Sequence, residues 1–330
     1  GVVWIECEGK FWQKTFGRRN VTGRGEATSE DTIYDTASLT KVLATAPSIL
    51  ILAERGKLKL NAPVVQYIPE FSGDKRQDIT IRQLLTHTSG LRPGISLRDN
   101  WTGREGALAK AYQEELQQMP DRGFKYSDIN FILLGEIVRR VSNKPLNEFA
   151  AAEIFKPLKM KDTLFLPAKK LRQRIAPTEI VGGQLLRGIV HDPTARRMGG
   201  VAGHAGIFST AADIAKFARM ILGGGQLEST RILKEESIRL MTSVQSPNAL
   251  LDKRGLGWDI DSPYSSPRGN LFPIGSFGHT GFTGPTLWID PESSSFWILM
   301  TNRNHPNGKG SVVPLRRSLG TLAAEAVSNY

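Results

Sequence analysis

A serine and a lysine three positions apart, Ser38 and Lys41, are the side chains whose types and spacing best suit nucleophilic catalysis. Residues at this spacing share one face of a helix, so the Lys41 amine would lie beside the Ser38 hydroxyl. A neutral lysine there can take the hydroxyl proton while serine attacks a carbonyl carbon, and burial beside another cation would lower its pKa. Ser72 and Lys75 have the same spacing but lie in a polar loop, whereas Ser38 opens an apolar helix. The spacing alone is a weak signal, and this context favours Ser38 over Ser72 as the candidate nucleophile.

The segment Tyr126-Ser127-Asp128 supplies a second candidate group, in a loop that leads into a predicted helix. A tyrosine held between cations can shuttle protons to a leaving group. Asp128 could orient Lys41 or bind substrate. Taken alone, the segment favours a structural interpretation, a half-buried loop tyrosine followed by a helix cap.

The third candidate group is His279-Thr280-Gly281, on a predicted strand, with the following Phe282. The glycine lets a substrate backbone lie close to the strand. The amides of Phe282 and Ser38 could form an oxyanion hole, and His279 would place a cation or a hydrogen-bond donor near Tyr126. The structural alternative is an ordinary edge strand that ends in a glycine-rich turn.

Regular elements must bring these distant groups together. A β-hairpin is predicted from residues 2–5 and 11–16, and a long helix over 39–55 with a kink at Pro47. Further helices are predicted at 82–86, 105–119, 129–141, 146–155 and 313–328, with another that begins near 209–213 and ends at the glycines 223–225. Strands are predicted at 255–260, 278–289 and 296–302.

Strands at both ends of the chain and helices in its middle predict an α+β fold, with one antiparallel sheet flanked by helices. Residues 1–57 and 225–330 would form this sheet domain. Residues 58–224 would form an inserted, mainly helical domain.

Composition excludes several other classes of protein. With a single cysteine, Cys7, and five histidines at unpaired spacings, we expect no disulfide, no metal and no cofactor. The net charge is +11, but the basic residues are scattered and no nucleic-acid motif is present, so we expect no nucleic-acid partner. The alternatives are an ordinary basic surface or attraction to an anionic cell-wall polymer. The longest apolar run, 42–53, is too short to span a membrane.

Together and in this order, the three groups resemble the class C β-lactamase-like serine hydrolases, which include D-Ala-D-Ala carboxypeptidases, D-aminopeptidases and lactamase-like esterases. The resemblance covers nearly the whole chain and rests on the stretches 34–41, 54–58, 81–91, 126–128, 203–210 and 278–284. It implies a sheet flanked by helices with an all-helical domain inserted.

The resemblance also implies roles for single residues. Ser38 would be the acylated nucleophile, Lys41 its base partner and Tyr126 the proton shuttle. His279 stands where the family has lysine or histidine, and histidine is commoner in the peptidase-like and esterase-like relatives than in efficient lactamases. Asp128 departs from the asparagine or serine that family members often carry.

The sequence thus predicts a serine hydrolase that acts on an amide or ester through an acyl-enzyme. A peptidoglycan-type peptide containing D-amino acids is the first choice of substrate. The alternatives are a small-ester carboxylesterase, a weak β-lactamase and, from another class, a sensor that penicillin or wall fragments acylate without turnover. Because the relatives are mostly exported, we expect a periplasmic or extracellular location, with any export signal removed or outside this sequence.

Overall fold

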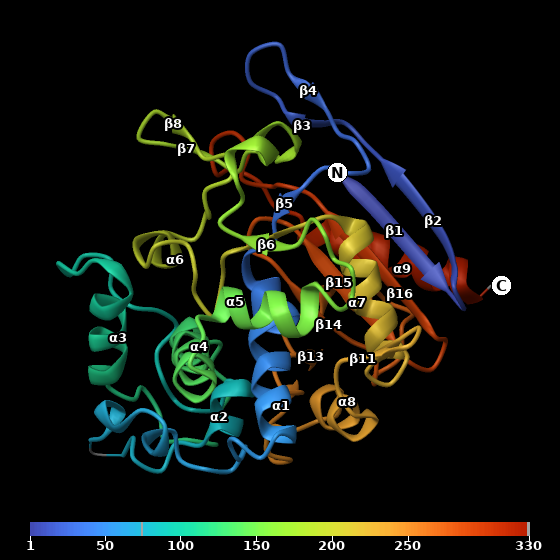
Figure 1. Cartoon of the computed structure of the whole chain (residues 1–330). Coiled ribbons are helices and arrows are strands. Elements are labelled where there is room, and N and C mark those ends of the chain that lie inside the picture. The colour runs from blue at the N-terminus through green and yellow to red at the C-terminus, as the bar shows by residue number, and fades with distance from the viewer. Residues whose placement is uncertain (74, 329–330) are drawn as a thin grey trace.

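The structure is a computed structural model that describes residues 1–73 and 75–328. An antiparallel seven-stranded sheet with the order β12-β13-β14-β15-β16-β1-β2 is its largest element, and Figure 1 shows it behind α7. Its strands are β1 (Val2–Cys7), β2 (Lys10–Thr15), β12 (Lys253–Arg254), β13 (Asp259–Asp261), β14 (Phe277–Thr280), β15 (Thr286–Asp290) and β16 (Ser295–Met300). The predicted hairpin is confirmed as β1 and β2, and β1 also pairs with β16 along its whole length.

The other strands form four small sheets. They are formed by β3 (Arg18–Asn20) with β4 (Glu26–Ala27), by β7 (Ile180–Val181) with β8 (Gln184–Leu185), by β10 (Gln226–Leu227) with β11 (Thr230–Arg231), and by β5 (Tyr34–Asp35), β9 (Ile207–Ser209) and β6 (Leu164–Phe165). Strand β5 of the last sheet ends at Asp35, three residues before the predicted nucleophile Ser38.

Helices are the other regular elements of the described chain. The α-helices are α1 (Ala46–Glu54), α2 (Ile81–Leu85), α3 (Gly103–Gln113), α4 (Asp128–Ser142), α5 (Leu146–Ala150), α6 (Pro193–Arg197), α7 (Ala211–Leu222), α8 (Glu235–Thr242) and α9 (Val313–Ser328). The 3-10 helices are η1 (Ala37–Leu39), η3 (Val64–Gln66), η4 (Pro69–Phe71), η6 (Lys169–Arg174) and η7 (Ser266–Arg268), and the π-helical turns are η2 (Lys41–Thr45) and η5 (Ala151–Phe155).

Helices α7 and α9 cover opposite faces of the large sheet. Successive strand residues point to opposite faces, and on β1 the ring of Trp4 meets Arg219 of α7, whereas Val3 packs with Ala323 of α9. Figure 1 accordingly shows α7 in front of the strands and α9 behind them.

The long helix predicted over 39–55 is confirmed as one helical stretch, Ala37–Glu54. Within it, a 3-10 turn and the π-helical turn Lys41–Thr45 lead directly into α1, with Pro47 in the first turn of α1. Pro47 has no N–H to donate, and the π-helical turn that ends two residues before it is the irregularity in this helix. The stretch Ala37–Glu54 has the length and composition of a membrane-spanning helix, but 83% of it is buried inside the fold, and buried core helices pass the same test.

Two other predicted elements are shorter than expected. The strand predicted at 278–289 is two strands, β14 and β15, because the glycines at 281 and 284 and Pro285 turn the chain between them. The helix predicted at 105–119 ends at Gln113, since Leu116 forms a β-bridge with Leu91 instead.

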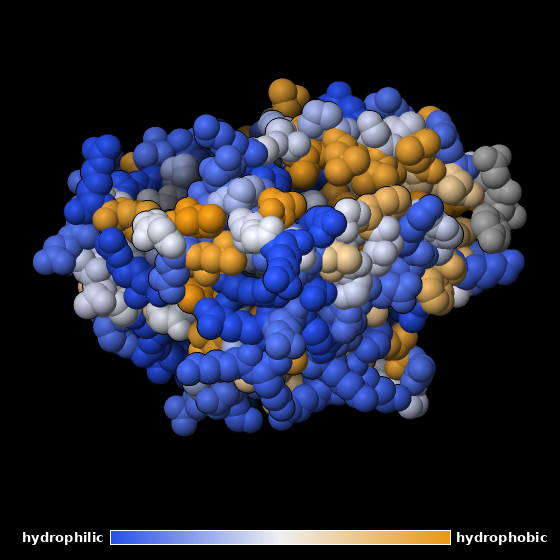
Figure 2. All heavy atoms as spheres, turned by 90° about the horizontal axis from the view of Figure 1, so that it is seen from above, coloured by the Kyte–Doolittle hydropathy of each residue, from blue (hydrophilic) through white to orange (hydrophobic). Residues whose placement is uncertain are grey.

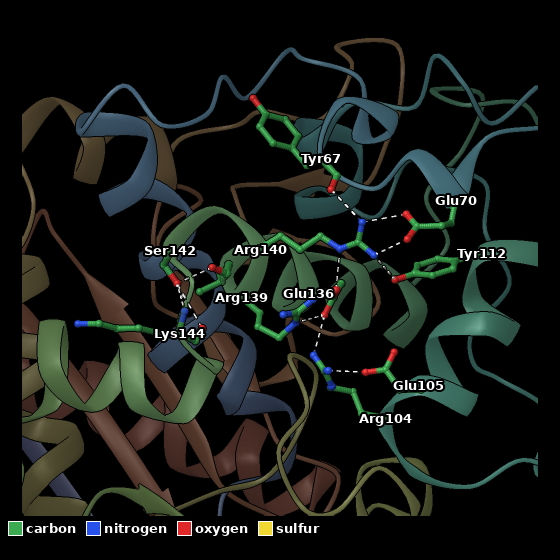
Figure 3. A network of polar contacts seen from close by, with 11 residues as sticks. Tyr67, Glu70, Arg104, Glu105, Tyr112, Glu136, Arg139, Arg140, Ser142 and Lys144 are labelled. Carbon is green, nitrogen blue, oxygen red and sulfur yellow. Dashed lines mark hydrogen bonds and ion pairs between the residues drawn. The ribbon is translucent and has the colours of Figure 1, made fainter.

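A buried acidic residue ties the helices together (Figure 3). The side chain of Glu136 on α4 is 3% exposed and pairs with Arg104 of α3 at 3.1 Å and with Arg139 and Arg140 of its own helix at 2.7 Å. Arg140 also reaches Glu70 of η4 at 2.8 Å. The Glu136 carboxylate therefore joins α3 to α4, and Arg140 extends the network to η4.

The division into a sheet domain and an inserted helical domain stays a prediction. Helix α7, which the predicted boundary at residue 224 assigns to the helical part, packs on β16 and β1. The face seen from above is mostly hydrophilic, with apolar side chains gathered on the side where Figure 1 places β2 and α9 (Figure 2). Exposed apolar residues on these two elements include Trp12, Leu315 and Leu322.

Candidate active site

One cleft, of about 630 Å³, lies where η1, the loop before α4 and the end of β14 meet. Its lining includes the predicted site residues Ser38, Tyr126, Asp128, His279, Thr280, Gly281 and Phe282. Lys41 lies just beneath, with no exposed side-chain area. The other serine–lysine pair, Ser72 and Lys75, is not part of this lining, and Asp74 between them lies outside the described residues.

Ser38 is presented on a tight turn after β5. Ala37, directly before it, has a φ of 46°, a left-handed conformation that costs energy for a residue with a Cβ. The N–H of Ala37 donates to the Asp35 carboxylate at 2.9 Å, and the N–H of Thr36 donates to the carbonyl of Ile207 on β9 at 2.9 Å. The surrounding strands therefore stabilise an otherwise unfavourable turn.

Lys41 has its amine surrounded by acceptors. Nζ lies 2.9 Å from Oγ of Ser38, 3.2 Å from the carbonyl oxygen of His204 and 2.7 Å from Oδ1 of Asp128. An ammonium has three protons to donate and no lone pair. Three acceptors around one nitrogen therefore match a protonated lysine.

The sequence-based expectation of a neutral Lys41 is corrected by its surroundings. Burial lowers its pKa, but the charge of Asp128 and contact with the Tyr126 phenol outweigh burial, so the pKa of Lys41 is raised. The cause is that the neighbour of the lysine is a carboxylate and not a second cation. The resting ammonium donates to Ser38 and must hand on a proton before it can accept one.

Tyr126 is fixed by ring contacts on several sides. Its ring stacks on His87 with a centroid distance of 4.4 Å and lies 4.9 Å from Nζ of Lys41. His87 is buried, and its Nδ1 accepts the N–H of Ser127 at 3.0 Å. Burial and the charges of Arg254 and Lys41 keep the pKa of His87 far below its usual value, so a neutral imidazole holds the loop that carries Tyr126.

His279 is a neutral imidazole and not the cation that the sequence left open. Its Nδ1 lies 2.9 Å from the carbonyl oxygen of Thr280, a contact that requires a proton on Nδ1, so Nε2 is an acceptor. Burial, Arg254 and Lys41 hold its pKa well below the usual value. The ring lies 6.1 Å from that of Tyr126, between centroids.

The turn that carries Phe282 packs tightly against the nucleophile turn. A Cβ on Gly281 would lie 2.5 Å from the carbonyl oxygen of Thr36, so only glycine fits there. Arg316 of α9 donates to the carbonyls of Gly281 and Gly284 at 2.7 and 3.0 Å. These contacts fix the backbone whose amide at Phe282 is the predicted oxyanion donor.

Sequence reasoning missed several residues of this cleft. Arg254 is 1% exposed, pairs with Asp259 at 2.9 Å and has no acceptor at Nε among the described residues. Arg316, also in the lining, is 7% exposed and has no carboxylate partner in the described part of the chain. No local sequence pattern identifies either arginine, because packing of the sheet brings Arg254 on β12 to the cleft and packing of α9 brings Arg316 there.

Asp128, Asp192 and His204 bring three potential metal-ligand atoms within 4.8 Å of one another. Protein groups already occupy them: Lys41 pairs with Asp128, His204 lies 2.9 Å from Asp192, and Asp192 caps α6 by accepting the N–H of Ala195 at 2.7 Å. Because an ammonium already lies against this group, we assign no metal to it.

Comparisons with known proteins agree with this architecture. A relative from Escherichia coli strain K12, with the provisional name D-alanyl-D-alanine carboxypeptidase, is 30% identical over 306 residues, 83% of this chain and 70% of the relative. A penicillin-binding protein homologue from Caulobacter crescentus superposes with a TM-score of 0.80 at 20% identity and covers 99% of this chain and 92% of its own. For a class C β-lactamase from Rhodobacter sphaeroides the TM-score is 0.76 at 19% identity, with 98% and 94% covered.

These likenesses confirm the predicted α+β fold, in which helices flank an antiparallel sheet. The sequence profile of the family described as Beta-lactamase matches residues 2–320. With this match over nearly its whole length, the chain belongs to the Beta-lactamase family and has the fold of its hydrolases.

Proposed function

We propose that this chain is a serine hydrolase that forms an acyl-enzyme on Ser38 and cleaves peptidoglycan-type peptides ending in a D-amino acid with a free carboxylate. The observation that carries the proposal is the position of the Lys41 amine, which contacts Ser38 Oγ and Asp128 Oδ1 at the floor of the cleft. This arrangement offers the serine proton a path away from the hydroxyl.

In the acylation step, Oγ of Ser38 attacks the carbonyl carbon of the substrate. The serine proton passes to Lys41 while Lys41 gives one of its own protons to Asp128. The amides of Ser38 and Phe282 stabilise the negative charge on the carbonyl oxygen, an interaction that strengthens as the tetrahedral intermediate forms.

The leaving group departs when its bond to the carbonyl carbon breaks and it takes the phenol proton of Tyr126. Tyr126 then recovers a proton from Asp128 through Lys41, which restores the resting charges. A water attacks the acyl ester next, with its proton going to the same set of groups. Ser38 regains a proton as the acid product leaves.

The substrate class is supported by the charge in the cleft. Arg316 is a buried cation whose described partners are neutral carbonyls and the hydroxyl of Thr286. Burial and the nearby Arg303 lower its pKa to about 10, so it remains charged at neutral pH. A buried charge without a counter-ion favours a substrate that brings a carboxylate, and the name of the Escherichia coli relative points to the same kind of peptide.

A parallel assay tests this proposal. Four substrates are compared: a peptide ending in D-Ala-D-Ala, the same peptide with an amidated C-terminus, nitrocefin and a short-chain p-nitrophenyl ester. We expect the highest kcat/KM for the free-acid peptide, a clear drop for the amidated one, and no turnover of any of them by the Ser38→Ala variant.

Each other outcome assigns a different function. Turnover of the ester alone would replace the peptidase by a carboxylesterase, and fast turnover of nitrocefin alone by a β-lactamase. A stable covalent adduct without turnover would indicate a sensor. Full activity in the Ser38→Ala variant would overturn the acyl-enzyme on Ser38.

A further inference from the structure

Asp35 is a buried acidic residue that the mechanism above does not use. Only 2% of it is exposed. Its Oδ1 accepts the N–H of Ala37 at 2.9 Å, its Oδ2 accepts the N–H of His191 at 2.7 Å, and its backbone carbonyl accepts the hydroxyl of Thr283 at 2.8 Å. One residue thus joins three segments that are far apart in the sequence.

Each of these segments forms part of the cleft wall. Ala37 holds the left-handed conformation that presents Ser38. His191 lies before α6, and its ring stacks on that of Phe282 at a centroid distance of 5.7 Å. Thr283 directly follows Phe282, whose amide is the proposed oxyanion donor. Asp35 therefore lies behind both backbone amides that the mechanism assigns to the carbonyl oxygen.

We propose that Asp35, as an ionised carboxylate, is the positioning residue that fixes the nucleophile turn against the His191 segment and the Phe282 turn. The inference rests on the proposed function, since it concerns the reactivity of Ser38. An ionised carboxylate accepts hydrogen bonds at both oxygens, whereas a protonated one, or an asparagine, turns a donor toward one of the two N–H groups.

Ionisation of the Asp35 carboxylate costs free energy, because the charge is buried. Burial raises the pKa of Asp35 to about 6, against the opposing effect of the N–H groups of His191 and Ala37 and the charge of His191. The ionisable groups that face it are His191 and Asp192, and Asp192 raises the pKa further. Because folding raises the pKa of Asp35, its protonated form stabilises the fold at a pH below the pKa it has in the unfolded chain. This stabilisation is lost as the pH rises through about 6, the pKa in the folded protein.

The variant Asp35→Asn therefore distinguishes a role in positioning Ser38 from a role in stabilising the fold. The variant lacks the cost of a buried charge, so we expect its Tm at pH 8 to equal or exceed that of the wild type. It can satisfy only one of the two N–H groups, so we expect the rate of Ser38 labelling by a fluorophosphonate to fall at least about tenfold, an effect of the size seen when a reacting group is misplaced.

The pH profile supplies a readout that a purely structural role would not move. The labelling rate of the wild type should fall as the pH drops through about 6, and the Asp35→Asn variant should lack this limb. Asp213 is a matched control, because it is also a buried carboxylate and accepts the N–H of Asp162 and the hydroxyl of Thr163. Asp213→Asn should lower the Tm and keep the acid limb.

A wild-type labelling rate in Asp35→Asn at pH 8, or an unchanged acid limb, overturns the inference. Hydrogen exchange distinguishes its failure from that of the proposed function. If fluorophosphonate does not label the wild type, the acyl-enzyme proposal fails, and the amide exchange rates of Ala37 and His191 still test Asp35. Faster exchange at one or both amides in Asp35→Asn supports the positioning role, and unchanged exchange at both refutes it.

Discussion

Asp128→Asn removes the anion that lies 2.7 Å from the Lys41 amine and keeps the shape of the side chain. Coulomb's law at this separation gives about 1.5 kcal/mol in water and about 6 kcal/mol at an effective dielectric constant of 20. The Asp128 charge therefore outweighs burial and raises the pKa of Lys41. Asp128 is 31% exposed, so the interaction energy lies nearer the lower of these two values.

The assay is an NMR titration of protein labelled at the lysine side chains, combined with the pH dependence of kcat/KM. We expect the pKa of Lys41 to fall in the variant, because the charge that raises it is gone. A lysine that can no longer pass a proton to Asp128 must be neutral to accept the serine proton, so kcat/KM should gain a new acid limb at the pKa of Lys41 in the variant. Asp99→Asn is the matched control, because Asp99 pairs with the exposed Lys110 at 3.0 Å, and it should leave the pKa of Lys41 unchanged. A Lys41 pKa that stays constant or rises in Asp128→Asn would refute the charge balance described for this site.

Three further predictions concern single residues. Tyr126→Phe should lower kcat by about 10²- to 10⁴-fold, the range expected for general acid–base groups, with KM and Tm little changed; a kcat near that of the wild type would remove the proton shuttle. Glu136→Gln should destabilise the fold by about 1–3 kcal/mol in urea unfolding, because three partly exposed arginines lose a buried charged acceptor. Burial raises the pKa of Glu136, but Arg139 and Arg140 lower it by more. The stability difference between Glu136→Gln and the wild type should therefore shrink as the pH falls through this lowered pKa, where Glu136 becomes protonated. A difference that does not depend on pH would contradict the ion-pair explanation. The imidazole of His279 should show neutral side-chain nitrogen shifts between about pH 6 and 8, because its pKa lies far below the usual one; a titration in that range would restore the cation that the sequence left open.

The main elements were predictable where one local signal determined them. The helix over 313–328 and the hairpin at the N-terminus follow from apolar spacing and turn residues, and the structure has both. The core helix was predicted without its π-helical turn, because periodicity does not reveal how a chain accommodates Pro47 until the helix is packed. The strand at 278–289 was predicted as one because both of its halves are rich in β-forming residues.

Part of the cleft lining was predictable from the sequence, whereas the charge states of its residues were not. Ser38, Tyr126 and His279 line one cleft as expected, since each stands in a segment with its own pattern. The charge state of Lys41 depends on Asp128, which approaches from another part of the chain, and the sequence alone does not give that distance. Asp35 stood within the segment 34–41 on which the resemblance rests, but only the fold places its carboxylate against His191.

The central claim is that Ser38 forms a covalent acyl intermediate. The direct measurement is peptide mass spectrometry after acid quench of the protein incubated with a penicillin or with the D-Ala-D-Ala peptide. We expect an added acyl mass on Ser38 in the tryptic peptide covering residues 25–41, and no such mass in the Ser38→Ala variant. An adduct on the peptide that contains Ser72, or substrate turnover that persists in Ser38→Ala, would contradict it.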